Sequence, residues 1–185
     1  MLRHLGPSIP RIFYFWDMKA VQNQVLNAKQ TLQKIKRIAH EIYEDNFKEE
    51  CIVFAGIEGM GYTFAKILKA EFEKIAPIKC ELIHISLDKT APLQSEITLD
   101  AETSIWLNKT IILTDDVLNT GKTLAYSLNP FLTNEIKRLQ TAVIVDRGHK
   151  DFPISADYVG YSLSTTIQER IQVILEGKNI GVYLH

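Results

Sequence analysis

The sequence predicts a single α/β domain with a central, mainly parallel sheet of about five strands, helices on both faces and a small hood of strand excursions. Short apolar runs typical of buried strands recur along the chain, at Cys51 to Ala55, Ile111 to Leu113 and Thr141 to Val145. Two of these runs lead through a glycine-containing turn into a helical segment. The length of 185 residues is enough for one well-packed domain and short for two.

The composition is that of an ordinary soluble globular protein, with 46% apolar and 23% charged residues. A net charge of -1 gives no general attraction to nucleic acid, so RNA binding would need a local basic patch. The only cysteines, Cys51 and Cys80, lie in apolar strand-like runs, which favours reduced, buried thiols over a disulfide, a metal site or a nucleophile. We therefore expect a cytoplasmic protein.

The N-terminal stretch carries little structural information. No apolar run reaches the roughly 18 residues that span a bilayer, and Ile12 to Trp16 is too short for a signal-peptide core of roughly 7 to 15 residues. No membrane contact is therefore expected. Met18 begins a sequence that would serve as a natural N-terminus, so residues 1–17 are treated as an extension of open status and residues 18–185 as the single domain.

An amphipathic helix is predicted from about Asn27 to Asn46. Its apolar residues recur at helical spacing: Leu32, Ile35, Ala39 and Ile42. The opposite face is basic, with Lys29, Lys36, Arg37 and His40. A solvated helix face is the favoured interpretation, and a stripe that binds RNA phosphates is the alternative.

The second element is the strand from Cys51 to Ala55, which leads through a glycine-rich loop into a helix from about Tyr62 to Ile75. The loop consists of Gly56, Ile57, Glu58, Gly59, Met60 and Gly61. Three glycines in six residues can turn backbone N–H groups inward to bind an anion. The spacing does not match Gly-x-Gly-x-x-Gly, which disfavours a dinucleotide fold.

Lys79 to Leu87 is predicted to be the next strand. A hairpin-like excursion follows, in which Asp88 to Pro92 precede a stretch of alternating character from Ser95 to Leu99.

The most informative stretch runs from Thr110 to Thr123. Its short apolar strand is followed by two adjacent carboxylates, Asp115 and Asp116, and then by a turn that opens a helix. Unpaired N–H groups at that helix start, the helix dipole and Gly121 together predict a cradle for a phosphate.

Negative charge beside a phosphate costs energy unless something is bound between them. Carboxylates accept hydrogen bonds from vicinal hydroxyls, so the stretch predicts a ribose 5-phosphate site. The residues assigned to it are Asp115, Asp116, Val117, Leu118, Asn119, Thr120, Gly121, Lys122 and Thr123. Asp115 and Asp116 are also the candidate catalytic residues and the candidate ligands of Mg²⁺.

Two other interpretations of this stretch are less consistent with its residues. A Walker A loop would need glycine at position 116, where Asp116 stands. A strand, turn and helix without function is the other alternative, and the doubled carboxylate beside the loop disfavours it.

Downstream, a helix is predicted from Lys122 to about Glu135, with a kink or early break at Asn129-Pro130. The strand from Thr141 to Val145 ends in Asp146-Arg-Gly-His149, which places polar groups at another carboxyl end. Arg147 can neutralise pyrophosphate or contact a base, and a salt-bridged surface arginine is an equally good alternative.

The end of the chain is predicted to form a hairpin. Ile171 to Glu176 and Ile180 to Leu184 alternate in polarity around Gly177-Lys178.

Several of these stretches carry a family resemblance. Thr114 to Thr123 resembles the phosphoribosyl pyrophosphate (PRPP) motif of type I phosphoribosyltransferases, in which two acidic residues precede a Thr-Gly-Lys/Arg-Thr loop. Further stretches resemble the PyrR proteins, which are pyrimidine operon attenuators with uracil phosphoribosyltransferase activity. These are Arg37-Ile-Ala-His-Glu41, Val145 to Gly160, Ser164 to Thr166, and Glu169-Arg170. The resemblance runs from about Met18 to the C-terminus and implies the type I phosphoribosyltransferase fold.

The resemblance implies that uracil and PRPP react to give uridine monophosphate (UMP) and pyrophosphate, with Mg²⁺ neutralising the leaving group. It implies that the 56–61 loop binds pyrophosphate. Glu58 and Met60 stand where the family usually carries Lys or Arg, so turnover is expected to be weak unless Glu58 points away. The excursion after Leu87 would form a lid over PRPP, with Lys89 the residue to watch or a plain surface lysine.

The resemblance also implies a base site and partners. The base-binding candidates are Asp146, Arg147, Tyr158 and Val159. Tyr158 can equally be a core residue. Dimers or larger homo-oligomers are implied, as is binding of an mRNA leader by Lys36, Arg37 and His40.

Three functions remain open at this point. The protein is an enzyme for uracil, a UMP- or PRPP-sensing RNA regulator with little turnover, or a phosphoribosyltransferase for hypoxanthine or guanine. Glu58 supports the regulator. Asn119 stands where the purine enzymes often place an aspartate that meets the base, and its amide cannot act as a base, which favours a pyrimidine.

Overall fold

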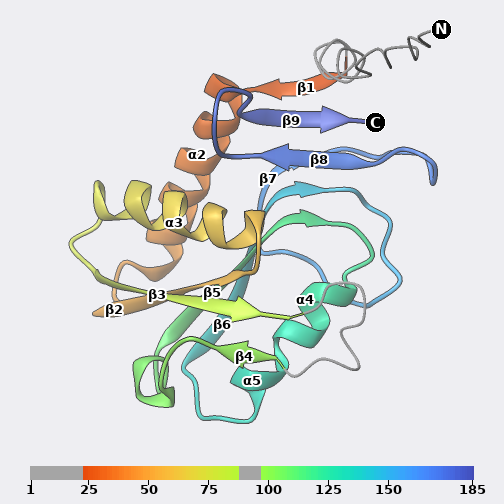
Figure 1. Cartoon of the computed structure of the whole chain (residues 1–185). Helices are drawn as coiled ribbons and strands as arrows, with labels where there is room; N and C mark the ends of the chain where they lie inside the picture. Colours follow the sequence, from red (N-terminus) through yellow and green to blue (C-terminus); the bar gives the residue numbers. More distant parts are fainter. Residues whose placement is uncertain (1–22, 88–96) are drawn as a thin grey trace, which may run out of the picture.

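The computed structural model describes residues 23–87 and 97–185, and its centre is a six-stranded sheet in the order β4-β3-β2-β5-β6-β7 (Figure 1). The strands are β2 (Cys51–Ile57), β3 (Lys79–Ser86), β4 (Thr98–Leu99), β5 (Thr110–Leu118), β6 (Arg138–Asp146) and β7 (Tyr158–Ser162). All neighbouring pairs are parallel except β3 with β4, which is antiparallel. The predicted α/β fold with a mainly parallel sheet is confirmed.

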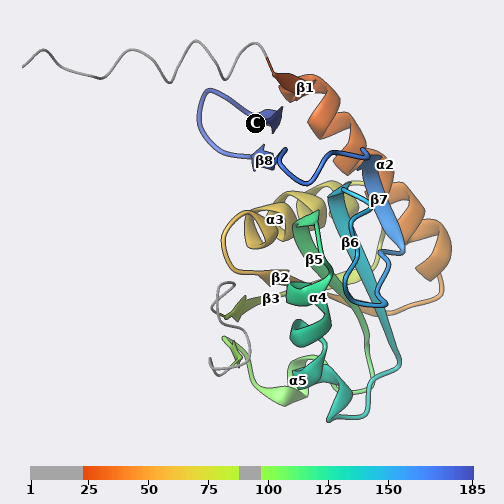
Figure 2. The same ribbon diagram turned by 90° about the vertical axis from the view of Figure 1, so that its right-hand side faces the viewer.

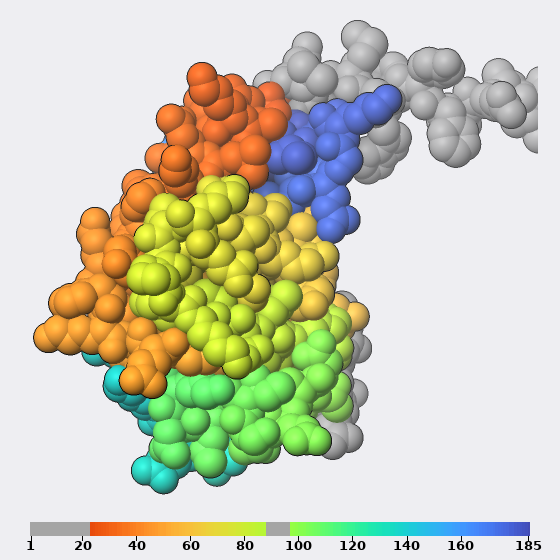
Figure 3. Space-filling view, turned by 90° about the vertical axis from the view of Figure 1, so that its left-hand side faces the viewer, coloured from red at the N-terminus to blue at the C-terminus, as the bar shows by residue number. Residues whose placement is uncertain are grey.

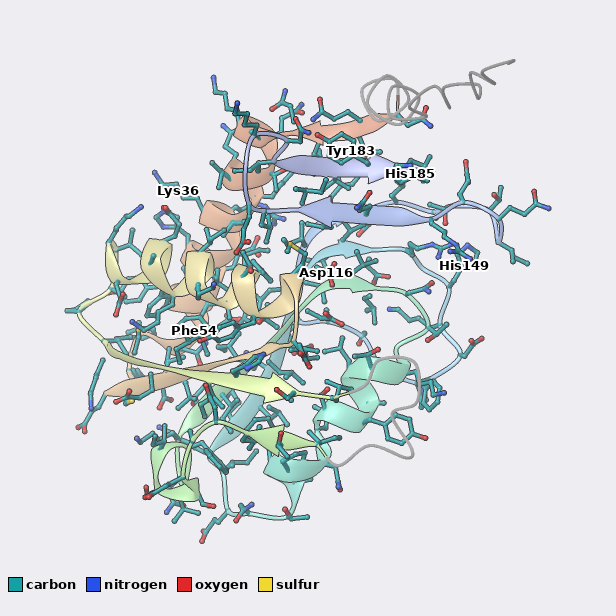
Figure 4. All side chains as sticks on the ribbon, viewed as in Figure 1. Lys36, Phe54, Asp116, His149, Tyr183 and His185 are labelled. Atoms are coloured by element: carbon teal, nitrogen blue, oxygen red, sulfur yellow. The ribbon has the colours of Figure 1, made fainter. Side chains whose placement is uncertain are left out.

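Helices cover both faces of this sheet (Figure 2). α2 (Ala28–Asn46) and α3 (Met60–Glu73) lie on one face, and η1 (Thr103–Ile105), α4 (Lys122–Ser127) and α5 (Asn129–Leu132) lie on the other. Because side chains alternate along a strand, Ile52 and Phe54 pack under α2 and α3 while Val53 and Ala55 pack against α4 and α5. Phe54 is fully buried between the sheet and the helices (Figure 4), so the buried strand β2 is apolar on both faces.

A second, three-stranded antiparallel sheet forms the hood, in the order β1-β9-β8. It consists of β1 (Gln24–Asn27), β8 (Ile171–Ile174) and β9 (Gly181–Leu184). The predicted C-terminal hairpin is therefore confirmed, with Gly177 in the left-handed region at φ 77°. The first strand was not predicted, because its four residues gain strand structure only by pairing with β9.

The surface view in Figure 3 shows how these parts meet. α3 occupies the middle of this face, α2 runs along its side, and β1 with the C-terminal strands lies above them. Thr63 of α3 donates a hydrogen bond of 3.0 Å to Glu176 in the β8–β9 turn. This bond ties the hood to the helix that follows the glycine-rich loop.

Several predicted boundaries need correction. β5 continues through Asp115 and Asp116 to Leu118, so the carboxylates lie within the strand and not after it. α3 begins at Met60, two residues earlier than predicted, and only Glu58 and Gly59 form the turn. The predicted break near Pro130 is confirmed, since α4 ends at Ser127 and α5 begins at Asn129.

The first predicted helix is confirmed, with Asn27 as its N-cap in a capping box with Gln30. Ile35, Ala39 and Ile42 are fully buried as expected, but Leu32 is 43% exposed. Ile38 and Thr31 take its place in the buried stripe, because the apolar face turns slightly around the helix.

Cys51 and Cys80 are free and half-buried. Burial raises the pKa of the Cys80 thiol to about 12, so this thiol is protonated and unreactive near neutral pH. In the described part of the chain, none of the helices combines the length and apolar character that crossing a membrane requires. Lys89 and most of the predicted lid lie outside the described residues, as does the extension 1–17; β4 confirms that the excursion returns antiparallel to β3.

Candidate active site

Asp116 of β5 lies beneath the hood (Figure 4), and Asp115 precedes it in the same strand. Asp115 is 4% exposed and Asp116 is half-buried. The Asp116 N–H donates to Oδ1 of Asp115 at 3.0 Å, which fixes the orientation of the first carboxylate. Burial of a carboxylate is costly, which makes Asp115 a candidate for a ligand-binding role.

The glycine-rich loop lies directly beside Asp115. Thr114 Oγ1 donates to the carbonyl oxygen of Gly61 at 3.0 Å, and a Cβ added at Gly61 would lie 3.0 Å from Oδ1 of Asp115. Gly61 therefore allows the first turn of α3 to approach the carboxylate closely. The structure brings together the acidic pair and the loop predicted to bind pyrophosphate.

The glycine-rich loop, residues 56–61, contains no lysine or arginine. Glu58 is exposed, and its N–H donates to the carbonyl oxygen of Ile85 at 2.9 Å. Gly59 has a φ of 84°, a left-handed conformation that glycine adopts without strain. Pyrophosphate would therefore find backbone donors here and one carboxylate in the turn.

The predicted phosphate loop closes a cavity at the carboxyl end of β5. The cavity is lined by Asp115, Val117, Leu118, Asn119, Thr120, Gly121, Lys122, Thr123 and Leu124. Gly121 is the N-cap of α4 with a φ of 82°, and a Cβ there would lie 2.6 Å from Cγ2 of Ile154. The carbonyl oxygen of Thr120 accepts from the N–H groups of Asp151 and Phe152, both at 3.0 Å, so the β6–β7 loop braces this turn.

A second cavity adjoins the first and lies between the sheet and the hood. It is lined by Asp116, Val117, Asn119, Arg147, Ile167, Arg170 and Ile171. Ile167 is 90% exposed, which is unusual for an apolar side chain at a cavity mouth. Ile167 was not predicted as a site residue, and Arg170 entered only through the family resemblance. The sequence signal that could have indicated Ile167 is an isoleucine among polar neighbours.

Arg147 organises the wall of this second cavity. It is 8% exposed and comes from the residue after β6. Its guanidinium donates to Oγ1 of Thr165 at 2.8 Å, to Oδ1 of Asn119 at 2.9 Å, and to the carbonyl oxygens of Thr166 at 3.0 Å and Glu169 at 2.7 Å. The alternative of a surface arginine is wrong, because this side chain is buried and hydrogen-bonded.

The loop before β8 is held by further contacts. Glu169 accepts hydrogen bonds from the N–H of Thr166 at 2.7 Å and from its hydroxyl at 2.9 Å. These bonds lower the pKa of the Glu169 carboxyl, so it stays ionised at neutral pH. His149 makes a short contact through Nε2 with the carbonyl oxygen of Thr165. The loop that carries Ile167 is therefore ordered by groups from the end of β6.

Three of the four base-site candidates lie outside the residues that line the two cavities. Tyr158 is 3% exposed, and its hydroxyl donates to Asp45 at 2.9 Å and accepts from Gln140 at 2.7 Å. Burial raises the pKa of this phenol. Because Tyr158 begins β7, it lies at the amino ends of the strands, and the core alternative is the correct one.

Val159 packs against the hydrophobic core. The carboxylate of Asp146 binds groups of the turn that follows it. Oδ1 of Asp146 accepts from the N–H of Gly148 at 2.8 Å, and Oδ2 pairs with Lys150 at 3.2 Å. Neither residue lines the two cavities. Of the four candidates, Arg147 alone borders the second cavity.

The residues of the basic stripe on α2 differ in their contacts. Arg37 pairs with Glu41 and donates to the carbonyl oxygens of Val159 at 2.6 Å and Gly160 at 3.0 Å, so it caps the edge strand β7. Lys36 and His40 are exposed. The three residues are therefore not equivalent, because Arg37 has a structural role.

The mainly parallel sheet, the small hood and the acidic pair near the turn at Gly121 fit a phosphoribosyltransferase. The family model "Phosphoribosyl transferase domain" matches residues 21–175, and the chain belongs to this family, within which it groups with the PyrR proteins. It is an enzyme of the phosphoribosyltransferase class.

Relatives and solved structures agree with this assignment. The "Bifunctional protein PyrR" of Clostridium novyi is 37% identical over 161 residues, covering 82% of this chain and 89% of the relative. The same protein of Clostridioides difficile is 36% identical over 162 residues, covering 82% and 90%. The crystal structure of the hypoxanthine phosphoribosyltransferase of Trypanosoma cruzi superposes with a TM-score of 0.73 at 16% identity, covering 88% of this chain and 95% of that one. It shows the shared fold.

Proposed function

We propose that the protein transfers the 5-phosphoribosyl group of PRPP to uracil, which yields UMP and pyrophosphate. The observation that carries the proposal is the shared border of the two cavities: Val117 and Asn119 line both, with Asp115 in one and Asp116 in the other. A phosphorylated pentose bound across this border would place its anomeric carbon near the second cavity. The resemblance to PyrR proteins favours uracil as the acceptor.

Each part of the chain would have a distinct task in this reaction. Asp115 and Asp116 would accept hydrogen bonds from the ribose hydroxyls, and residues 119–123 would hold the 5-phosphate. The base would lie in the second cavity against Ile167, in place of the Tyr158 and Val159 site predicted from the sequence. The bond from the anomeric carbon to the pyrophosphate oxygen breaks as the bond to the base nitrogen forms, and the proton of that nitrogen passes to water. Positioning supplies most of the catalysis.

The acidic pair also fits Mg²⁺. This ion usually binds through one or two carboxylates together with substrate oxygens, and the described residues contain no group of three or more His, Cys, Asp or Glu residues that could hold a metal by themselves. When bound with PRPP, Mg²⁺ supplies charge neutralisation of the leaving pyrophosphate. Asp115 and Asp116 would hold it through their carboxylate oxygens.

The proposal extends to the setting of the enzyme. We treat residues 18–185 as one domain, because the Thr63–Glu176 and Arg147 contacts tie the hood to the core. A homodimer or larger homo-oligomer is proposed from the family resemblance. Free thiols at Cys51 and Cys80 fit a cytoplasmic location, which is proposed on that ground.

Pyrophosphate release from PRPP tests the acceptor. With Mg²⁺ present, we expect uracil to react with a kcat/KM at least about tenfold above hypoxanthine and guanine. If a purine reacts as fast as uracil or faster, that purine takes the place of uracil as the proposed acceptor base. Silence with every base, combined with tight UMP binding, would leave the regulator as the function.

That regulator is the second candidate, and the exposed Glu58 in a loop without cations favours it. Lys36→Glu and His40→Glu test RNA binding without disturbing the fold, because both side chains are exposed on α2. If this face binds a leader RNA, each change should weaken binding and reduce the log–log salt slope by about 0.7 per lost phosphate contact. Lys178→Glu, an exposed change in the hood turn, is the matched control.

Arg37 is omitted from this pair because its removal would free the carbonyls of β7. Wild-type protein that binds no leader RNA at low salt would contradict the regulator. Weakening by Lys178→Glu equal to that by Lys36→Glu would instead indicate a general charge effect.

A further inference from the structure

The orientation of the Asn119 side chain is fixed by its neighbour. Nη1 of Arg147 lies 2.9 Å from Oδ1 of Asn119. A guanidinium has only donors, so the amide atom that faces it must be the oxygen, and a flipped amide would set N–H against N–H. The chemistry of Arg147 therefore determines which end of the amide points toward it.

Arg147 itself has no freedom to move away. Its Nε and Nη2 groups are bound to Thr165, Thr166 and Glu169, and its backbone N–H donates to the carbonyl oxygen of Leu118 at 3.0 Å. The side chain is 8% exposed, so water offers it few alternative partners. Breaking these bonds would leave a buried cation unpaired, which is strongly unfavourable.

The other end of the amide is left for a ligand. Asn119 is exposed and borders both cavities, and its Nδ2 group has no hydrogen-bond partner in residues 23–87 and 97–185. Arg170, which lines the second cavity, likewise offers donors only. Among the described residues that line this cavity, Asn119, Arg147 and Arg170 present donors, and Asp116 presents a carboxylate.

We propose that Arg147 locks Asn119 as a donor-only reader of the base, so that the site prefers bases with a ring carbonyl over bases with an exocyclic amine. A carbonyl oxygen accepts a hydrogen bond from Nδ2, whereas an amine places its own hydrogens against it. Arg147 is a positioning residue and Asn119 a specificity-determining one. The inference rests on the proposed function, because it requires the base to occupy the second cavity.

Two pairs of nucleotides test the inference: UMP with CMP, and IMP with AMP. In each pair the first base carries a ring carbonyl where the second carries an exocyclic amine. Titration calorimetry of the full chain should show UMP and IMP binding about tenfold or more tightly than CMP and AMP. Asn119→Asp keeps an acceptor for Arg147 but has no donor for the base, so the preference should fall to about one or reverse. Asn129→Asp, the same change at an exposed residue of α5, should leave it unchanged.

Arg147→Lys provides a second readout, because lysine cannot make all the bonds that hold the amide. It should lower the UMP/CMP preference while thermal unfolding reports any loss of fold. Ribose 5-phosphate has no base, so its binding tests the ribose-phosphate site separately from the base preference. Binding of ribose 5-phosphate and UMP with no preference over CMP, or a preference that survives Asn119→Asp, overturns the inference alone. Failure of every one of these ligands, PRPP included, overturns the proposed function and the inference with it.

Discussion

Asp116→Asn is expected to weaken PRPP binding in the presence of Mg²⁺ by about 10- to 100-fold, with little change in the free energy of unfolding. The half-buried carboxylate lines the second cavity, where its charge would strengthen hydrogen bonds from ribose hydroxyls and attract Mg²⁺. An amide of the same shape keeps one acceptor and loses the charge. Calorimetric titration with PRPP, with and without Mg²⁺, measures the loss.

Asp115→Asn should have an effect of the same size for the same reason. Its Oδ1 accepts the Asp116 N–H, and an asparagine oxygen can still do so, so the local backbone is expected to stay in place. Glu135→Gln removes one negative charge at an exposed position away from the cavities and serves as the control. Unchanged PRPP affinity in both aspartate variants would contradict the ribose assignment.

The fold could be predicted from the sequence because local patterns carried it. β2 is apolar at every buried position from Ile52 to Ile57, and α2 has apolar residues at helical spacing with Asn27 as its N-cap. Each element can therefore be recognised from a few neighbouring residues. The same holds for residues 115–123, where carboxylates, glycine and threonines stand next to each other in the chain. Such a site needs one loop and no knowledge of distant contacts.

The proposed base site could not be predicted in this way, because it is assembled from separate parts of the chain. Tyr158 was a reasonable aromatic candidate, but the partners of its hydroxyl, Asp45 and Gln140, are 113 and 18 residues away and place it in the core. Ile167 is positioned by the bonds from Arg147 and Glu169 within the loop around it. β1 similarly depends on pairing with the far end of the chain. Tertiary contacts of this kind leave little trace in local composition.

Gly121→Ala should affect both stability and binding, because two costs coincide at this residue. A φ of 82° strains any residue with a Cβ by about 1 kcal/mol, and the added Cβ would lie 2.6 Å from Cγ2 of Ile154. Relieving that overlap must move the turn that would hold the 5-phosphate. We expect unfolding to become easier by about 2 to 4 kcal/mol and ribose 5-phosphate to bind about 10- to 100-fold more weakly.

Two further variants separate strain from overlap. Gly177→Ala has a similar φ of 77° but nothing within 4 Å of its Cβ, so it should cost about 1 kcal/mol of stability and leave binding unchanged. Adding Ile154→Ala to Gly121→Ala removes the contact and not the strain, so affinity should return in part. If the double variant binds no better than Gly121→Ala, displacement by Ile154 is not the cause of the loss. A phosphate held by the backbone N–H groups of this turn should bind more weakly when the turn is displaced. If Gly121→Ala binds ribose 5-phosphate as the wild type does, the turn from Asn119 to Thr123 therefore does not hold the phosphate.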